Sequence, residues 1–137
     1  MKNKTVIITG ASSGIGKAIA KHFIEKESNV IMNSSNEENL KKTYEEFESP
    51  SNAFYLAGDI SKRETGQKLV ALALEKFDSV DVLINNAGVF SPKPFLDVRE
   101  DDLDLFWSVN LKGTYFTTQA AIPQMLNQKK GSIINIG

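Results

Sequence analysis

The chain has 137 residues, of which 41% are hydrophobic and 24% charged, within the range of one globular domain with its own core. Sixteen basic and seventeen acidic residues give a net charge of -1, which points to neither nucleic acid nor an anionic membrane as a partner. Cysteine is absent, which excludes disulfides and thiolate chemistry. No apolar run suits a signal peptide or a membrane span. We therefore expect a cytoplasmic protein that acts on a small molecule, without a metal site.

Short apolar runs alternate with amphipathic segments along the chain. The predicted elements are, in chain order, a strand at 5–9, a helix at 15–26, a strand at 29–33, a helix at 37–48, a strand at 53–57, a helix at 63–77, a strand at 80–85, a helix at 101–127 and a strand at 132–136. Pro123 is expected to bend the last helix, because its ring blocks a backbone hydrogen bond.

The first strand and helix show the pattern most clearly. Residues 5–9 form a β-branched run without polar alternation, as in a strand buried on both faces of a parallel sheet. In the helix, the residues predicted to face the sheet are Ile15, Ala18, Ile19, Phe23 and Ile24. Parallel strands need crossovers, so five such strands imply one α/β domain over 1–137, a doubly wound parallel sheet of the Rossmann type. Ligands bind such sheets at the carboxyl ends of the strands.

A glycine-rich turn, Thr9-Gly10-Ala11-Ser12-Ser13-Gly14-Ile15-Gly16, joins the first strand to the first helix. Gly10 can take the tight turn, Gly14 lets the backbone approach a pyrophosphate, and Gly16 lets the helix pack closely on the strand. The free N–H groups at the helix start attract phosphate. The spacing differs from the common G-x-G-x-x-G, and alone it also fits a merely tight connection.

Four ordered motifs resemble the short-chain dehydrogenase/reductase family. They are TGASSGIG at 9–16, Asp59-Ile60, Asn85-Asn86-Ala87-Gly88, and VNLKG at 109–113, and the strand at 131–136 resembles the one that leads to the family's catalytic serine. The resemblance implies strand order 3-2-1-4-5, without the family's last strands. It implies a catalytic role for Asn110, which helps to hold a water in a proton relay. The cofactor-binding residues that it implies are Gly10, Ser12, Ser13, Gly14, Ile15, Gly16, Ser34, Ser35, Asp59, Ile60, Asn86, Ala87 and Gly88.

Structural roles are possible for several of these side chains. Asp59 could cap a helix that starts near Ser61, and Asn86 and Gly88 could be turn formers. His22 is expected to be structural. Core or interface packing is expected for Phe106, Trp107 and Tyr115, and Tyr115 lacks the lysine four residues later that the family's catalytic tyrosine has.

The end of the second strand, Asn33-Ser34-Ser35-Asn36, bears on the choice of cofactor. An acid there binds the ribose diol of NAD, and an arginine accepts the phosphate of NADP. Neither is present, and the first acids, Glu37 and Glu38, are expected in the first turn of the next helix. Hydroxyl and amide groups can donate to a 2′-phosphate, so the sequence favours NADP(H) over NAD(H).

By the same resemblance, the catalytic serine would follow Gly137, and a Tyr-x-x-x-Lys would lie beyond it. We therefore expect these residues to hold cofactor-site elements only and to be inactive alone. The parent protein is expected to be a homo-oligomer that transfers hydride between a nicotinamide and a carbonyl or alcohol substrate. A non-catalytic nucleotide-binding module and an interaction protein remain alternatives. If the chain ended at Gly137, its fifth strand would form an exposed sheet edge and favour self-association.

Overall fold

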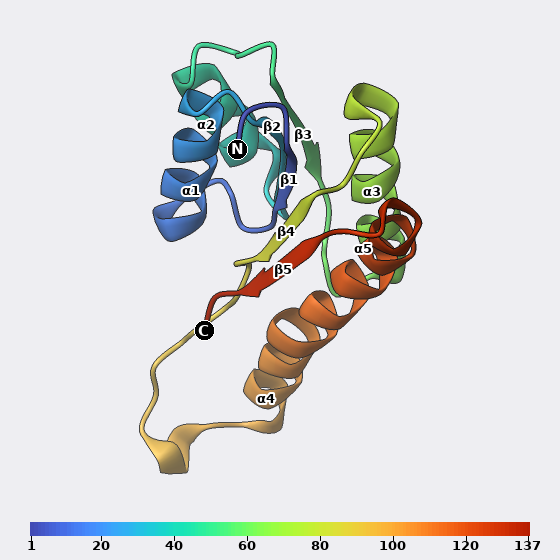
Figure 1. The fold of residues 1–137 in the computed structure, drawn as a ribbon. Coiled ribbons are helices and arrows are strands. Elements are labelled where there is room, and N and C mark those ends of the chain that lie inside the picture. The colour runs from blue at the N-terminus through green and yellow to red at the C-terminus, as the bar shows by residue number, and fades with distance from the viewer.

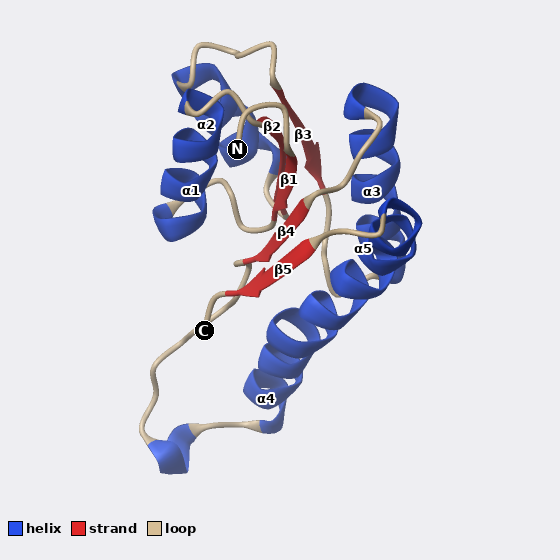
Figure 2. Cartoon of the chain, in the orientation of Figure 1, coloured by secondary structure: helices blue, strands red, loops and turns tan.

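A parallel sheet lies between two layers of helices in the computed structural model, which describes residues 1–137 (Figure 1, Figure 2). The elements are β1 (Thr5–Ile8), α1 (Gly14–Glu25), β2 (Asn29–Ser34), α2 (Glu37–Glu46), β3 (Ala53–Ala57), α3 (Arg63–Phe77), β4 (Val82–Asn85), the 3-10 helix η1 (Phe95–Asp97), α4 (Glu100–Phe106), the π-helix η2 (Trp107–Gly113), α5 (Thr114–Gln128) and β5 (Ser132–Asn135).

The strands lie in the order β3-β2-β1-β4-β5, and every neighbouring pair is parallel. Ile7 at the centre of β1 is opposite Ile31 of β2 and Leu83 of β4. The predicted fold class and strand order are confirmed. All carboxyl ends of the strands therefore meet at one edge of the sheet.

Two hydrophobic cores fill the two faces of the sheet. Val6 and Ile8 point into the core beneath α1 and α2, which also contains Leu40 of α2. Ile7 points the other way, into the core beneath α3 and α5 with Leu69. Successive residues of a strand face opposite sides, so an unbroken apolar run supplies both cores.

The prediction for the sheet-facing stripe of α1 is partly wrong. Ile15 is 62% exposed and Ala18 is also exposed, whereas Gly16 and Ala20 are the buried residues of the helix. The larger Ile19, Phe23 and Ile24 pack only against the margin of the core. The smallest side chains occupy the line of closest approach because they let the helix axis come near the strands.

The predicted long helix exists as a continuous run of α4, η2 and α5, with an irregularity that the sequence did not predict, and the bend expected at Pro123 stays a prediction. The departure from α-helical geometry is the π-helical turn at Trp107–Gly113, and Pro123 stands inside α5. Of the two roles expected for Trp107 and Tyr115, packing in the core is wrong, because these side chains are 61% and 62% exposed. No helix of the structure has the length and apolar character needed to cross a membrane.

β5 forms one edge of the sheet, and all four of its residues are exposed. β1 and β4, by contrast, are buried throughout. The self-association expected of a chain that ended at Gly137 stays a prediction.

A buried carboxylate joins the starts of β1 and β4. Asp81 Oδ2 accepts hydrogen bonds from Thr5 N (3.0 Å) and Ser79 Oγ (3.1 Å), and Oδ1 accepts one from Lys4 Nζ (3.3 Å). Burial by itself raises the pKa of Asp81, but these donors and the charge of Lys4 together hold it below its ordinary value. The charged form of Asp81 therefore stabilises the folded state.

We predict that Asp81→Asn lowers the free energy of unfolding by about 1–3 kcal/mol at neutral pH, the cost of weakening hydrogen bonds to a buried charge. A lowered folded pKa stabilises the protein above the unfolded pKa of about 3.9, and this contribution is lost as the pH falls through the folded pKa. Urea unfolding of both forms between pH 7 and pH 3 measures the difference, which should shrink with acidification.

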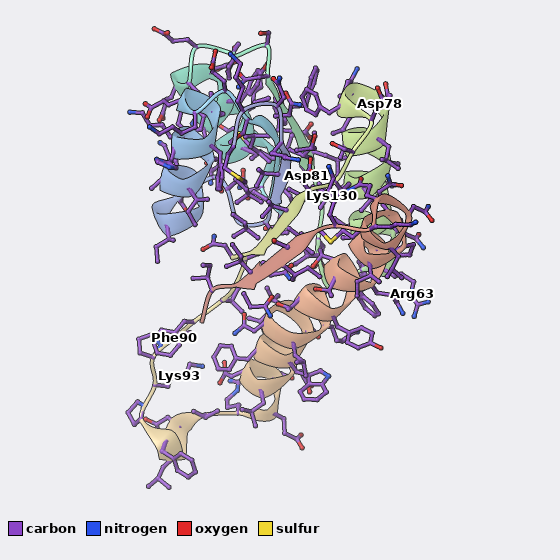
Figure 3. The ribbon with its side chains drawn as sticks, viewed as in Figure 1. Arg63, Asp78, Asp81, Phe90, Lys93 and Lys130 are labelled. Atoms are coloured by element: carbon purple, nitrogen blue, oxygen red, sulfur yellow. The ribbon has the colours of Figure 1, made fainter.

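Asp78→Asn is the matched control, since Asp78 is exposed at the end of α3 (Figure 3). It should change the unfolding free energy by no more than about 0.5 kcal/mol. A difference for Asp81→Asn that stays constant down to pH 3 would contradict the role assigned to the charge.

Candidate functional site

A cleft of about 380 Å³ opens at the carboxyl edge of the sheet. Of the predicted cofactor-binding residues, all line this cleft except Gly16, which is buried behind it. Four further residues line the cleft that were not among the predicted cofactor-binding residues: Asn33, Gly58, Val89 and Val109. Asn33 and Val109 belong to segments already singled out, 33–36 and 109–113, and Gly58 and Val89 directly adjoin such motifs. That proximity was the available signal.

The glycine-rich turn is shaped by two left-handed residues. Gly10 has φ +66° and Gly14 has φ +52°, a region that side chains disfavour. A Cβ on Gly10 would lie 2.8 Å from the Cα of Ala87, whereas a Cβ on Gly14 would meet no atom within 4 Å. Gly10 therefore permits close contact with the end of β4, and Gly14 leaves its side of the turn open to the cleft.

Asn86 fastens this turn from the neighbouring strand. Its Nδ2 donates to the carbonyl oxygens of Thr9 and Gly10, both at 3.2 Å. In return, Thr9 Oγ1 accepts from the backbone N–H groups of Asn86 (3.1 Å) and Ala87 (3.0 Å). A Cβ on Gly16 would collide with the Gly10 carbonyl and the Asn86 amide. Gly16 is thus required by the packing, and Thr9 is a contributor that the sequence analysis missed.

The start of α1 has no side-chain cap. Its N-cap, Ser13, makes no capping hydrogen bond, and the first turn carries no acidic residue. α2 differs, since Asn36 Oδ1 accepts from Asn39 N at 2.8 Å and Glu37 and Glu38 lie in its first turn, as predicted. Uncapped N–H groups and the positive end of the helix dipole attract an anion. Ser13, Gly14 and Ile15 line the cleft at this point, so the uncapped end faces it.

Ser34 and Ser12 meet on one wall of the cleft, where Ser12 Oγ donates to Ser34 Oγ at 2.9 Å. At the end of the neighbouring strand β3, Asp59 Oδ1 accepts from Ser61 N at 2.9 Å. Asp59 does not cap α3, because the N-cap of that helix is Lys62. Hydrogen bonding from Ser61 holds the pKa of Asp59 below its ordinary value, so the carboxylate is charged at neutral pH.

Comparison with known proteins gives the family. The family model described as short chain dehydrogenase matches residues 4–137. The chain belongs to this family. Relatives of short-chain dehydrogenase type include a diacetyl reductase, (S)-acetoin forming, of Staphylococcus epidermidis, 40% identical over 97% of this chain and 52% of its own length. An uncharacterized oxidoreductase of Listeria monocytogenes is 38% identical over 98% of this chain and 54% of its own length.

Solved structures agree with this assignment. A short-chain dehydrogenase/reductase of Brucella melitensis, named a glucose/ribitol dehydrogenase, superposes with a TM-score of 0.87 at 32% identity, over 90% of this chain and 53% of that one. A short-chain dehydrogenase of Streptomyces avermitilis gives 0.85 at 30% identity, over 98% and 48%. This chain spans about half the length of the short-chain dehydrogenases that it matches.

Asn110, the residue predicted to be catalytic, does not line the cleft. Its Oδ1 accepts from Val89 N at 2.8 Å and its Nδ2 donates to Val89 O at 3.0 Å. The amide thus pairs with both backbone groups of Val89, which does line the cleft.

Beyond Val89 the chain leaves the sheet in a long loop that carries Phe90 and Lys93 (Figure 3). Lys93 Nζ binds both carboxylate oxygens of Asp102, at 2.7 and 2.8 Å, and so ties the loop to α4.

We predict that Gly16→Ala lowers the unfolding free energy by about 1–3 kcal/mol, the usual cost of forcing extra volume into a packed site. The added methyl group must displace the Gly10 carbonyl and the Asn86 amide, so the side-chain NH₂ resonances of Asn86 should shift in an NMR spectrum.

Gly14→Ala provides the control. It costs only the strain of a positive φ, about 1–2 kcal/mol, and should leave the Asn86 side-chain resonances in place. Unshifted Asn86 resonances in Gly16→Ala would show that the close approach is not what requires glycine at this position.

Proposed function

We propose that the protein is a nicotinamide-dependent oxidoreductase that transfers hydride between NADP(H) or NAD(H) and a small carbonyl or alcohol substrate. The observation that carries the proposal is the uncapped start of α1, whose first residue Gly14 has a positive φ, at a cleft on the carboxyl edge of the sheet. The switch in strand order between β1 and β4 lies beside it. In open α/β sheets, ligands bind at this position.

The residues present fit a dinucleotide. In the proposal, the cofactor's pyrophosphate lies against the open side of Gly14 and the first turn of α1, where no side chain blocks the backbone. Asp59 and Ile60 bind the adenine end, and Ala87 and Gly88 line the path toward the nicotinamide. When bound, the nicotinamide supplies or accepts the hydride. The chain's own contribution is to bind and orient that cofactor.

Within this proposal, Asn110 acts through Val89. Because both hydrogen-bonding atoms of its side chain are used by the Val89 backbone, the amide holds the cleft wall that follows Gly88. We infer that the residue positions this wall on the substrate side.

The substrate class follows from the relatives. The relative of 40% identity is named a diacetyl reductase, so a small diketone is the first substrate to test. The residues around the end of β2 favour NADP(H), because positions 33–36 contain neither a carboxylate nor an arginine.

We predict that the intact protein binds NADPH at least about tenfold more tightly than NADH, the factor that corresponds to roughly 1.4 kcal/mol. We also predict that it oxidises NADPH when diacetyl is added. Fluorescence titration measures the binding, and loss of nicotinamide absorbance measures the reaction. Binding without turnover of any small carbonyl compound would favour a non-catalytic nucleotide-binding module, and failure to bind either cofactor would refute the proposal.

We also propose that the protein forms a homo-oligomer through the long helix. Large apolar side chains recur along α4, η2 and α5 at mostly four-residue steps and lie 40–70% exposed: Leu103, Trp107, Leu111, Tyr115, Ile122 and Leu126. An exposed apolar stripe of this length marks a protein interface.

We predict that Leu111→Glu in the intact protein shifts it to a smaller species in sedimentation velocity, because the charge must be desolvated at the interface. Gln67→Glu, at an exposed position of α3, adds the same charge away from the stripe and should leave the assembly unchanged. Identical sedimentation of wild type and Leu111→Glu would exclude this face as the interface.

A further inference from the structure

Thr43 of α2 reaches the glycine-rich turn from behind. It is only 2% exposed, and its Oγ1 donates to the backbone carbonyl of Ser12 at 2.9 Å. Thr43 does not itself line the cleft, whereas Ser12 does. The Thr43 hydroxyl therefore acts on the cleft only through Ser12.

Ser12 passes this restraint on to the end of β2. The Ser12 carbonyl accepts a hydrogen bond from Thr43 of α2, and the Ser12 Oγ donates to Ser34 Oγ at 2.9 Å. The same Ser34 oxygen accepts from Asn36 N at 3.3 Å. A serine hydroxyl has two acceptor lone pairs and one proton. Because both lone pairs are used, the Ser34 hydroxyl can donate a hydrogen bond to a ligand in the cleft but cannot accept one.

The end of β2 is where dinucleotide-binding sheets contact the ribose 2′ position. A 2′-hydroxyl is best bound by an acceptor such as a carboxylate, whereas a 2′-phosphate offers only acceptor oxygens to neutral donors. The carboxylates that follow β2 along the chain, Glu37 and Glu38, lie in the first turn of α2 and outside the cleft lining. The one acid in the lining, Asp59, comes from the end of β3 and already accepts a hydrogen bond from Ser61 N. A Ser34 fixed as a donor therefore suits the phosphate.

We propose that Thr43 is a positioning residue that, through Ser12, fixes the Ser34 hydroxyl as a donor to the cofactor's 2′-phosphate and so sets the preference for NADP(H). The proposal rests on the proposed function, because it requires a nicotinamide dinucleotide in the cleft. It assigns part of the cofactor choice to a buried residue that cannot touch the cofactor.

The test measures dissociation constants of NADPH and NADH by fluorescence titration of the intact protein. Thr43→Val keeps the shape of the side chain but removes the donor, and should weaken NADPH about three- to tenfold, the range of one net hydrogen bond, with NADH unchanged. Thr43→Ser retains the hydroxyl and should keep the wild-type ratio. Equal weakening of both cofactors by Thr43→Val would show a structural role only and overturn the proposal.

A double-mutant cycle makes the route specific. If Thr43 acts through Ser34, Thr43→Val should add no further loss of NADPH affinity to Ser34→Ala, whereas additive losses would overturn the proposal. Should Thr43→Val fail to fold by circular dichroism, Ser12→Ala removes the donor to Ser34 instead. An unchanged NADPH to NADH ratio in that variant overturns the proposal.

The wild-type protein separates this inference from the function on which it rests. Binding of both cofactors without preference would overturn the role of Thr43 and leave the oxidoreductase proposal standing. Failure to bind either cofactor would overturn both.

Discussion

The close approach of three backbone segments at the centre of the sheet is the constraint on which the site depends. The turn after β1, the first turn of α1 and the end of β4 meet where Gly16 has no side chain. That space lets the Asn86 amide reach the carbonyls of Thr9 and Gly10. Gly10 in turn accommodates Ala87 at a distance that a side chain would prevent. Glycine is needed here for packing before any ligand is considered.

This packing also decides which groups face the cleft. Asn86 uses its side-chain amide to hold the turn, and Asn110 uses its own to hold Val89, so neither amide donor is directed at a ligand. The groups that remain include the uncapped start of α1 and the hydroxyls of Ser13, Ser34 and Ser35. The polar side chains at the strand ends thus shape the cleft, and backbone amides supply much of its binding capacity.

Local patterns predicted the strands and the glycine-rich turn, whereas the family resemblance supplied the strand order and 12 of the 16 residues that line the cleft. The errors have physical reasons. Apolar periodicity marked Ile15 as sheet-facing, but the closest approach selects small residues, and Gly16 and Ala20 take that place. The π-helical turn at Trp107–Gly113 changes the phase of the long helix without a sequence signal comparable to a proline. The pairing of Asn110 with Val89 spans 21 residues and follows from no periodicity.

The charge of the cleft illustrates why composition says little about such a site. None of its lining residues is basic, and Asp59 is the only acid among them. With that carboxylate charged, side chains alone give the cleft a negative balance, which would repel a dinucleotide. In the proposed function, the attraction that the lining supplies comes from the aligned peptide dipoles of α1 and from neutral donors such as the Ser34 hydroxyl. These are fixed by backbone geometry, so the affinity for a phosphate depends on how firmly the turn is held. The hydroxyl of buried Thr43, bound to the Ser12 carbonyl, belongs to that support as much as the glycines do.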